Sequence, residues 1–224
     1  MTSPGSSVIK ALRASYDDVV QMLDGLEEES AWQPTGCIGW SVRDLVFHMW
    51  ADGQRALVAL ATPSDDDPDV DRVSYWREFQ PGTDPAQVGL RMTRISASVY
   101  SSLAPIRTSY EETTRAVVHA VGQADLAAPV RTQGHVITGA DLLHTLLVET
   151  AVHHLDLVDA LDRPGPAPAS LDAVCATLDG LWGRQRPAGW DDKTYVRVGT
   201  GRSPLTESAR AELGVDADRL PLFG

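Results

Sequence analysis

One stretch decides the fold of this chain: Leu142–Asp162, LLHTLLVETAVHHLDLVDALD. Most of its residues are apolar and recur at helical spacing, which predicts one long, largely buried helix. The stretch also contains Glu149 and His153, four residues apart and therefore on one face of that helix. A carboxylate within an apolar stripe is costly unless something compensates its charge. A bound metal ion is one candidate, and a buried Glu–His pair without metal is the alternative.

Asp156 follows His153 by three residues and lies on the same side of the predicted helix. An imidazole that binds a metal usually donates its other ring N–H to a carboxylate or a carbonyl. Asp156 is therefore expected to orient the His153 ring by accepting a hydrogen bond from the ring nitrogen that does not bind the metal. The spacing matches neither the HExxH motif of zinc proteases nor the Glu-x-x-His pairs of di-iron bundles, so a mononuclear site is what remains.

Catalytic zinc sites usually have three protein ligands and one open position, so a third ligand has to come from another part of the chain. His48 is the best candidate, because it lies near the edge of the apolar face of a second predicted helix, Val42–Leu60. That helix has a strong start signal, since Ser41 is followed three residues later by Asp44, as in a capping box. The competing histidines are His119, His135, His144 and His154.

The rest of the pattern predicts a mainly α-helical protein. Further helices are expected at about residues 8–26, 84–103, 171–185 and 207–213, and helical pattern resumes after a break or kink at Pro105 and continues to about Val121. Joined helices that each have one apolar stripe bury those stripes by forming a bundle. The sequence thus predicts a bundle of four main helices, with the helix near 84–104 interposed between them.

Some β structure is expected beside the helices. Residues 126–138 carry β-branched side chains around Gln133-Gly134, which favours a short hairpin. Thr194–Val198 alternates like a strand and could pair with residues 130–137. We therefore expect two parts, a helical bundle over residues 1–163 and a short mixed α/β extension over residues 164–224 that packs on it.

Composition limits the partners and the location. The chain has 224 residues and a formal net charge of −12, which disfavours nucleic acid and anionic membrane surfaces as partners. Its apolar runs are too short to span a bilayer. The two cysteines, Cys37 and Cys175, form no disulfide framework, so a cytoplasmic protein with reduced thiols is expected. A small-molecule substrate is the expected partner, and exposed apolar faces could support a homodimer.

Two passages together resemble one family. CIGWSVRDLVFHMWADG, residues 37–53, is similar to the second-helix signature of the DinB-like superfamily, in its mycothiol-dependent maleylpyruvate isomerase branch. VETAVHHLDLVDALDRP, residues 148–164, is similar to the Glu-x-x-x-His-x-x-Asp helix of the same family. The closing segment TGRSPLTESARAELGVDADRLPLFG, residues 200–224, also resembles that of many members.

The resemblance implies a DinB-like four-helix bundle that binds a divalent metal, commonly zinc, through His48, Glu149 and His153. Asp156 matches the acid that follows the second histidine in the family helix. The metal would hold a low-molecular-weight thiol such as mycothiol as its thiolate, which is the nucleophilic form. Attack on an electrophilic small molecule would give S-transfer or isomerisation. Arg202 would either reach over the metal to bind an acidic group of substrate or thiol, or simply tie the tail to the bundle.

Two other functions stay open on the sequence. A metal enzyme of a biosynthetic or hydrolytic pathway would keep the metal and use no thiol. A non-catalytic ligand-binding bundle would use the same polar residues only to stabilise its fold.

Overall fold

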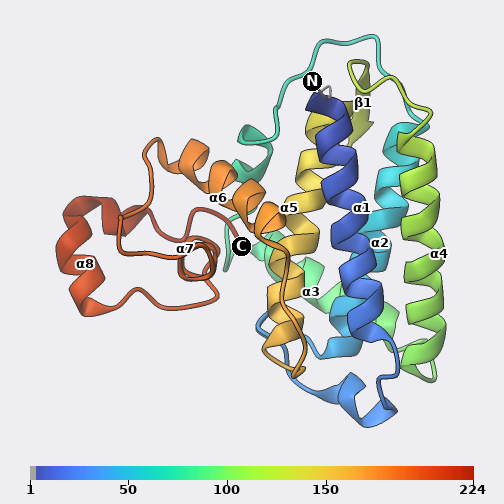
Figure 1. The fold of residues 1–224 in the computed structure, drawn as a ribbon, viewed down its shortest axis with the longest axis horizontal. Helices are drawn as coiled ribbons and strands as arrows, with labels where there is room; N and C mark the ends of the chain where they lie inside the picture. The colour runs from blue at the N-terminus through green and yellow to red at the C-terminus, as the bar shows by residue number, and fades with distance from the viewer. Residues whose placement is uncertain (1–3) are drawn as a thin grey trace.

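The computed structural model of the protein describes residues 4–224 and is mainly helical, which confirms the predicted fold class. Four long helices lie side by side as a bundle, and three shorter helices form an extension on one side of it (Figure 1). The bundle helices are α1 (Pro4–Leu23), α2 (Val42–Leu60), α4 (Leu103–Val121) and α5 (Gly139–Val158). The other helices are α3 (Asp84–Ala97), which packs on α2, and the extension helices α6 (Pro168–Trp182), α7 (Asp192–Gly199) and α8 (Glu207–Leu213). Three short 3-10 helices complete the set, η1 (Glu28–Trp32), η2 (Ser74–Glu78) and η3 (Gly214–Arg219).

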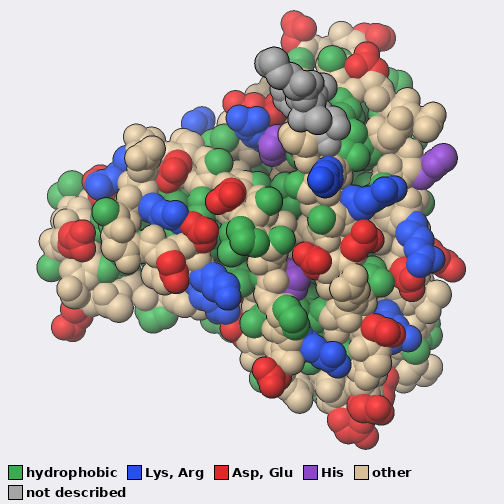
Figure 2. All heavy atoms as spheres, viewed as in Figure 1, with side chains coloured by type: hydrophobic (Ala, Val, Ile, Leu, Met, Phe, Trp, Pro, Cys, Tyr) green, Lys and Arg blue, Asp and Glu red, His purple; other side chains and the backbone are tan. Residues whose placement is uncertain are grey.

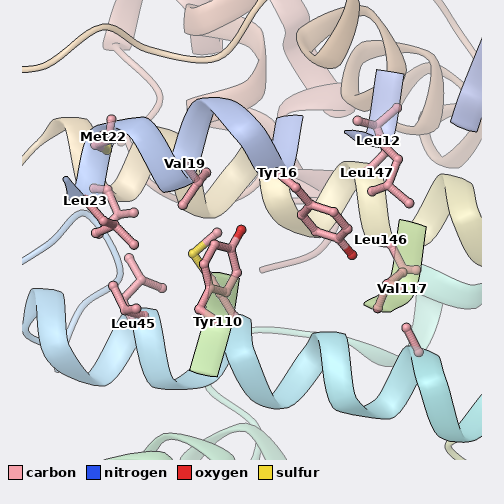
Figure 3. Packing of buried hydrophobic residues seen from close by; sticks show 14 of the residues in the cluster. Leu12, Tyr16, Val19, Met22, Leu23, Leu45, Tyr110, Val117, Leu146 and Leu147 are labelled. Carbon is pink, nitrogen blue, oxygen red and sulfur yellow. The ribbon is translucent and has the colours of Figure 1, made fainter. Parts of the chain in front are cut away.

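The bundle core forms where the apolar stripes of its four helices meet. Figure 3 shows side chains of α1 pointing toward α2, α4 and α5. Tyr16 of α1 and Tyr110 of α4 meet edge to face, with ring centroids 6.3 Å apart. The other labelled residues of this core are Leu12, Val19, Met22, Leu23, Leu45, Val117, Leu146 and Leu147.

Helix α5 of the bundle also packs against the extension. Leu143 and Leu146 pack in the bundle core, whereas Val152 and Leu155 pack in a second core with α6, α7 and the end of the chain. A helix that is apolar on most sides is expected to be buried on most sides. This explains why the stretch that contains Glu149 and His153 is so rich in leucine and valine.

The prediction of a strand at Thr194–Val198 is wrong, because these residues belong to helix α7. The side chain of Asp191 accepts a hydrogen bond from the Thr194 N–H and caps the helix. Tyr195 and Val198 lie three residues apart and are both buried, so the alternating run also fits one face of a short helix. The predicted pairing of this segment with residues 130–137 is wrong as well. At the edge of the hairpin, Val130 instead forms an antiparallel bridge with Pro63. The extension is therefore helical, without a strand among its described residues.

The boundary between α3 and α4 also differs from the expectation. Helix α3 ends at Ala97, before Pro105, and α4 starts at Leu103. Pro105 is thus in the first turn of α4, where the missing N–H of proline does little harm. The proline follows the break in the chain and does not cause it.

The hairpin expected at residues 126–138 is confirmed. Strands β1 (Pro129–Thr132) and β2 (His135–Thr138) pair antiparallel, with Gln133 and Gly134 as the turn. Both turn residues have positive φ, 45° and 87°, as a two-residue type I′ turn requires. The hairpin leads directly into α5, whose first turn is capped by the Thr138 side chain.

His135 connects this hairpin to the acidic segment that follows α2. Its Nδ1 lies 3.3 Å from an Asp69 oxygen and its Nε2 lies 3.2 Å from a Glu78 oxygen. Burial lowers the pKa of His135, but the two carboxylates outweigh it and hold the pKa above the ordinary value of 6.5. A protonated His135 can donate to both carboxylates at once and so fasten residues 69–78 to the hairpin.

We expect this contact to stabilise the protein mainly at low pH. A raised folded-state pKa contributes stability that is complete below the ordinary pKa and is lost as the pH rises through the folded value. Replacing His135 with glutamine should therefore lower the free energy of unfolding more at about pH 5.5 than at about pH 8.5. Urea unfolding of both proteins at the two pH values measures this difference. An equal loss at both values would show that the charge of His135 does not matter.

The surface carries charges of both signs. On the face shown in Figure 2, acidic and basic side chains are interspersed over the bundle and the extension. None of the helices in the described part of the chain is long and apolar enough to cross a membrane. The division of the chain at residue 163 stays a prediction.

Candidate metal centre

Helix α2 positions His48 in its second turn. The predicted capping box at its start is present: the Ser41 side chain accepts from the Asp44 N–H, and the Asp44 carboxylate accepts from the Ser41 N–H. This reciprocal cap fixes the helix start and hence the direction of the His48 side chain, which is 26% exposed. The helix begins and ends where the sequence predicted.

Helix α5 brings Glu149 and His153 to the same point. Glu149 Oε1 lies 2.8 Å from His48 Nε2 and 3.4 Å from His153 Nε2. The two imidazole rings are nearly perpendicular, with centroids 4.8 Å apart. One potential ligand atom from each of the three residues lies within 4.8 Å of the others. The structure thus brings together the three residues that the sequence proposed as ligands.

Asp156 contacts the ring nitrogen of His153 that faces away from Glu149, as predicted. Its Oδ2 is 2.9 Å from His153 Nδ1, and its side chain is completely buried. Burial raises the pKa of Asp156, but the nearby Arg202 guanidinium and the hydrogen bond to His153 outweigh it and hold the pKa below its usual value. A charged Asp156 accepts the Nδ1–H of His153 and so fixes the ring with its Nε2 toward Glu149.

Arg202 contacts Asp156 from the extension. Its Nε and one terminal nitrogen each lie 3.2 Å from an Asp156 oxygen, and its other terminal nitrogen donates to the Thr200 carbonyl at 2.9 Å. The guanidinium is only 10% exposed. Of the two roles expected for Arg202, this contact favours tying the extension to the bundle.

Trp40 covers the two imidazoles from the loop before α2. Its ring centroid is 4.7 Å from that of His48 and 6.0 Å from that of His153. Its indole N–H donates to the Leu90 carbonyl of α3, which holds the ring in place. The interposed helix therefore supports the candidate centre indirectly through Trp40, a function that its sequence pattern did not reveal.

Gly36 allows the same loop to lie against α5. Its N–H donates to the Asp156 carbonyl at 3.0 Å. A Cβ atom at this position would lie 2.5 Å from Asp159 Oδ2 and 2.7 Å from Asp156 Oδ1. The Asp156 carboxylate is held on two sides, so it cannot move away easily.

Replacing Gly36 with alanine should therefore destabilise the protein by about 1–3 kcal/mol, as overpacking usually does. Gly89→Ala on α3 is the matched control, because nothing lies within 4 Å of the added methyl group. Urea unfolding of both variants tests the expectation. Equal stability of the two variants would mean that the loop can shift without cost.

Two further residues on α2 share the face of His48, and sequence reasoning missed them. Asp52 and Arg55 follow His48 by four and seven residues, a spacing that could have identified them. They form an ion pair, and Arg55 also donates to the Tyr75 hydroxyl at 3.2 Å and to Thr132 Oγ1 at 3.0 Å. The charge of Glu149 is near enough to contribute to the raised pKa of Arg55.

The competing histidines do not join the centre. His154 is buried and bonded to the Pro164 carbonyl, and His135 lies between Asp69 and Glu78. Among the residues that the structure describes, there is one group of three or more His, Cys, Asp or Glu side chains that lie close enough to share a metal ion. It consists of His48, Glu149 and His153.

The donor set fits a divalent cation. Two imidazoles and one carboxylate are common zinc ligands, and three protein ligands leave a position for water or substrate. Burial raises the pKa of Glu149, but hydrogen bonds from His153 and His48 outweigh it and hold the pKa well below its usual value. The carboxylate is thus charged and available to a cation, and all three side chains are partly or fully withdrawn from solvent. Metal binding by these residues stays a prediction.

Comparison with known proteins gives the family. The family described as "Mycothiol maleylpyruvate isomerase N-terminal domain" matches residues 12–158, which include most of the bundle and all three candidate ligands. No curated protein and no solved structure matches the chain. Because the match covers well over half of the chain, the protein belongs to the mycothiol maleylpyruvate isomerase N-terminal domain family, a DinB-like helical family.

Proposed function

We propose that the protein is a divalent-metal-dependent enzyme that activates a low-molecular-weight thiol, such as mycothiol, for S-transfer to or isomerisation of an electrophilic small molecule. The observation that carries the proposal is the meeting of His48, Glu149 and His153 within 4.8 Å, in a family named for a mycothiol isomerase. Zinc is the proposed metal, because two imidazoles and a carboxylate match a common catalytic zinc set.

The protein's own residues prepare the ligands. Asp156 accepts the Nδ1–H of His153 and so presents its Nε2 toward Glu149. Arg202 fixes the Asp156 carboxylate in turn. Trp40 shields both imidazoles on one side and excludes water there. A zinc ion held by these ligands would lower the pKa of a bound thiol, so that the thiolate is present at neutral pH.

The thiol is proposed to come from solution. Burial raises the pKa of Cys37 and of Cys175 to about 12. In the protein without a bound cation, both thiols are therefore uncharged at neutral pH and poor nucleophiles. A small thiol available in the cytoplasm would supply the nucleophile, and the protein is proposed to act there.

Replacement of zinc by cobalt(II) gives a direct test of thiol binding. A thiolate bound to cobalt(II) absorbs strongly in the near ultraviolet, so titration with mycothiol should produce such a band that saturates at one equivalent. His48→Ala should lose the band, whereas the surface control His119→Ala should keep it. If the protein holds the metal but mycothiol changes neither the spectrum nor turnover of an electrophile, the enzyme does not use a thiol.

A further inference from the structure

Two arginines that lie near the candidate metal centre, Arg55 and Arg202, already have a carboxylate partner. Arg202 is bound to Asp156, and Arg55 is bound to Asp52. Arg202 reaches the centre through Asp156, which is bonded to His153. Arg55 follows His48 by seven residues on the same face of α2. Neither is free to neutralise a further negative charge.

The remaining donors of these arginines are also committed. Arg55 donates to the Tyr75 hydroxyl and to Thr132, which fastens η2 and the hairpin to α2. Arg202 donates to the Thr200 carbonyl. Both side chains are largely buried, at 19% and 10% exposed, and so are their partners Asp52 and Asp156, at 9% and 0%. Turning either arginine toward a substrate would leave a buried carboxylate without its partner.

The charge balance at the centre then limits what can bind. A divalent cation held by the Glu149 carboxylate and two neutral imidazoles carries a net single positive charge. One thiolate cancels that charge. A second anion would have to enter a largely buried site beside Trp40, where the charges of Arg55 and Arg202 are already paired.

We propose that the electrophile accepted by this protein is an uncharged molecule, not a dicarboxylate such as maleylpyruvate, the compound in the family's name. This inference rests on the proposed function and specifies the substrate class of the same site. An epoxide is a suitable example. The thiolate sulfur forms a bond to an epoxide carbon as the C–O bond breaks, and the oxygen takes a proton from solvent to replace the one that the thiol released. No oxidant or reductant is needed.

Two epoxides that differ only in a remote charge test the inference. Phenyl glycidyl ether is neutral, and its para-carboxylate analogue has the same reacting group. With zinc-loaded protein and mycothiol, kcat/KM for the neutral epoxide should be at least about tenfold higher, because an unpaired buried carboxylate costs more than one tenfold step in affinity. Equal turnover, or a preference for the carboxylate, would overturn the inference.

Binding of the two corresponding diols, which cannot react, provides a readout without turnover. Calorimetry on the zinc-loaded protein saturated with mycothiol, whose thiolate cancels the charge of the centre, should show at least about tenfold tighter binding of the neutral diol, by the same desolvation argument. Binding of neither diol, or equal binding of both, would count against the inference. Absence of turnover with both epoxides would remove the proposed function, while the ratio of diol affinities would still decide the substrate class.

Removal of one counter-charge gives a sharper test. Asp52→Asn should leave Arg55 with an uncompensated positive charge and so raise the affinity for the carboxylate diol relative to the neutral one. Asp66→Asn is the matched control, because it frees Arg131 from an exposed pair instead. The ratio of the affinity for the carboxylate diol to that for the neutral diol should change in Asp52→Asn and not in Asp66→Asn. An unchanged ratio in a folded Asp52→Asn protein would contradict the proposed role of the Arg55–Asp52 pair.

Discussion

Glutamine in place of Glu149 should abolish the proposed binding of a divalent metal while leaving the bundle folded. The amide keeps one oxygen that can accept the hydrogen bonds now made to His48 and His153, so the unloaded fold retains its contacts. The glutamine side chain lacks the negative charge of Glu149, which a bound cation requires. We expect zinc affinity to fall at least about 100-fold, since loss of an outer partner alone typically costs 10–100-fold.

Competition with a chelator and elemental analysis measure this change. Glu111→Gln is the matched control, because Glu111 lies on α4 and pairs with the exposed Arg115. The control should bind zinc like the unmodified protein. If Glu149→Gln retained one equivalent of zinc with unchanged affinity, Glu149 would not be a ligand.

Loss of the Asp156 carboxylate should be the most destabilising single change at the candidate centre. Asp156→Ala leaves Arg202 largely buried without a counter-charge and leaves His153 Nδ1 without an acceptor. Removal of one partner of a buried ion pair typically costs about 3–5 kcal/mol. We expect a decrease of that size in the free energy of unfolding, together with weaker zinc binding.

Asp159→Ala is the natural comparison, because it lies one turn further along the chain and also pairs with an arginine. Its two bonds to Arg197 are short, 2.7 and 2.6 Å, but both side chains are partly exposed, at 34% and 24%. Exposed pairs contribute about 0–1 kcal/mol. Urea unfolding should therefore separate the two variants by at least about 2 kcal/mol, the difference between these two ranges. Similar decreases in the free energy of unfolding of both variants would show that the buried Asp156–Arg202 pair contributes no more than the partly exposed Asp159–Arg197 pair.

Much of the fold could be predicted because local signals were strong. Ser41 and Asp44 marked the start of α2, and Gln133-Gly134 marked the hairpin turn. The errors arose where local pattern is ambiguous. Thr194–Val198 is too short to distinguish an alternating strand from a helix with one buried face, and the difference depends on packing against α6.

The candidate site was predictable to the extent that it lies within one helix. Glu149, His153 and Asp156 share a face of α5 by spacing alone. His48 lies 101 residues from Glu149 along the chain, so its place came from helix pattern and family resemblance. The Trp40 cover and the Arg202–Asp156 bond join separate segments and depend on tertiary structure.

Anomalous diffraction at the zinc edge, from crystals of the zinc-loaded protein, tests the central claim most directly. The account predicts one strong peak about 2.0–2.2 Å from the Nε2 atoms of His48 and His153 and from a Glu149 oxygen, with a fourth position open to water or thiol. A peak elsewhere, or no peak between these three side chains, would contradict it.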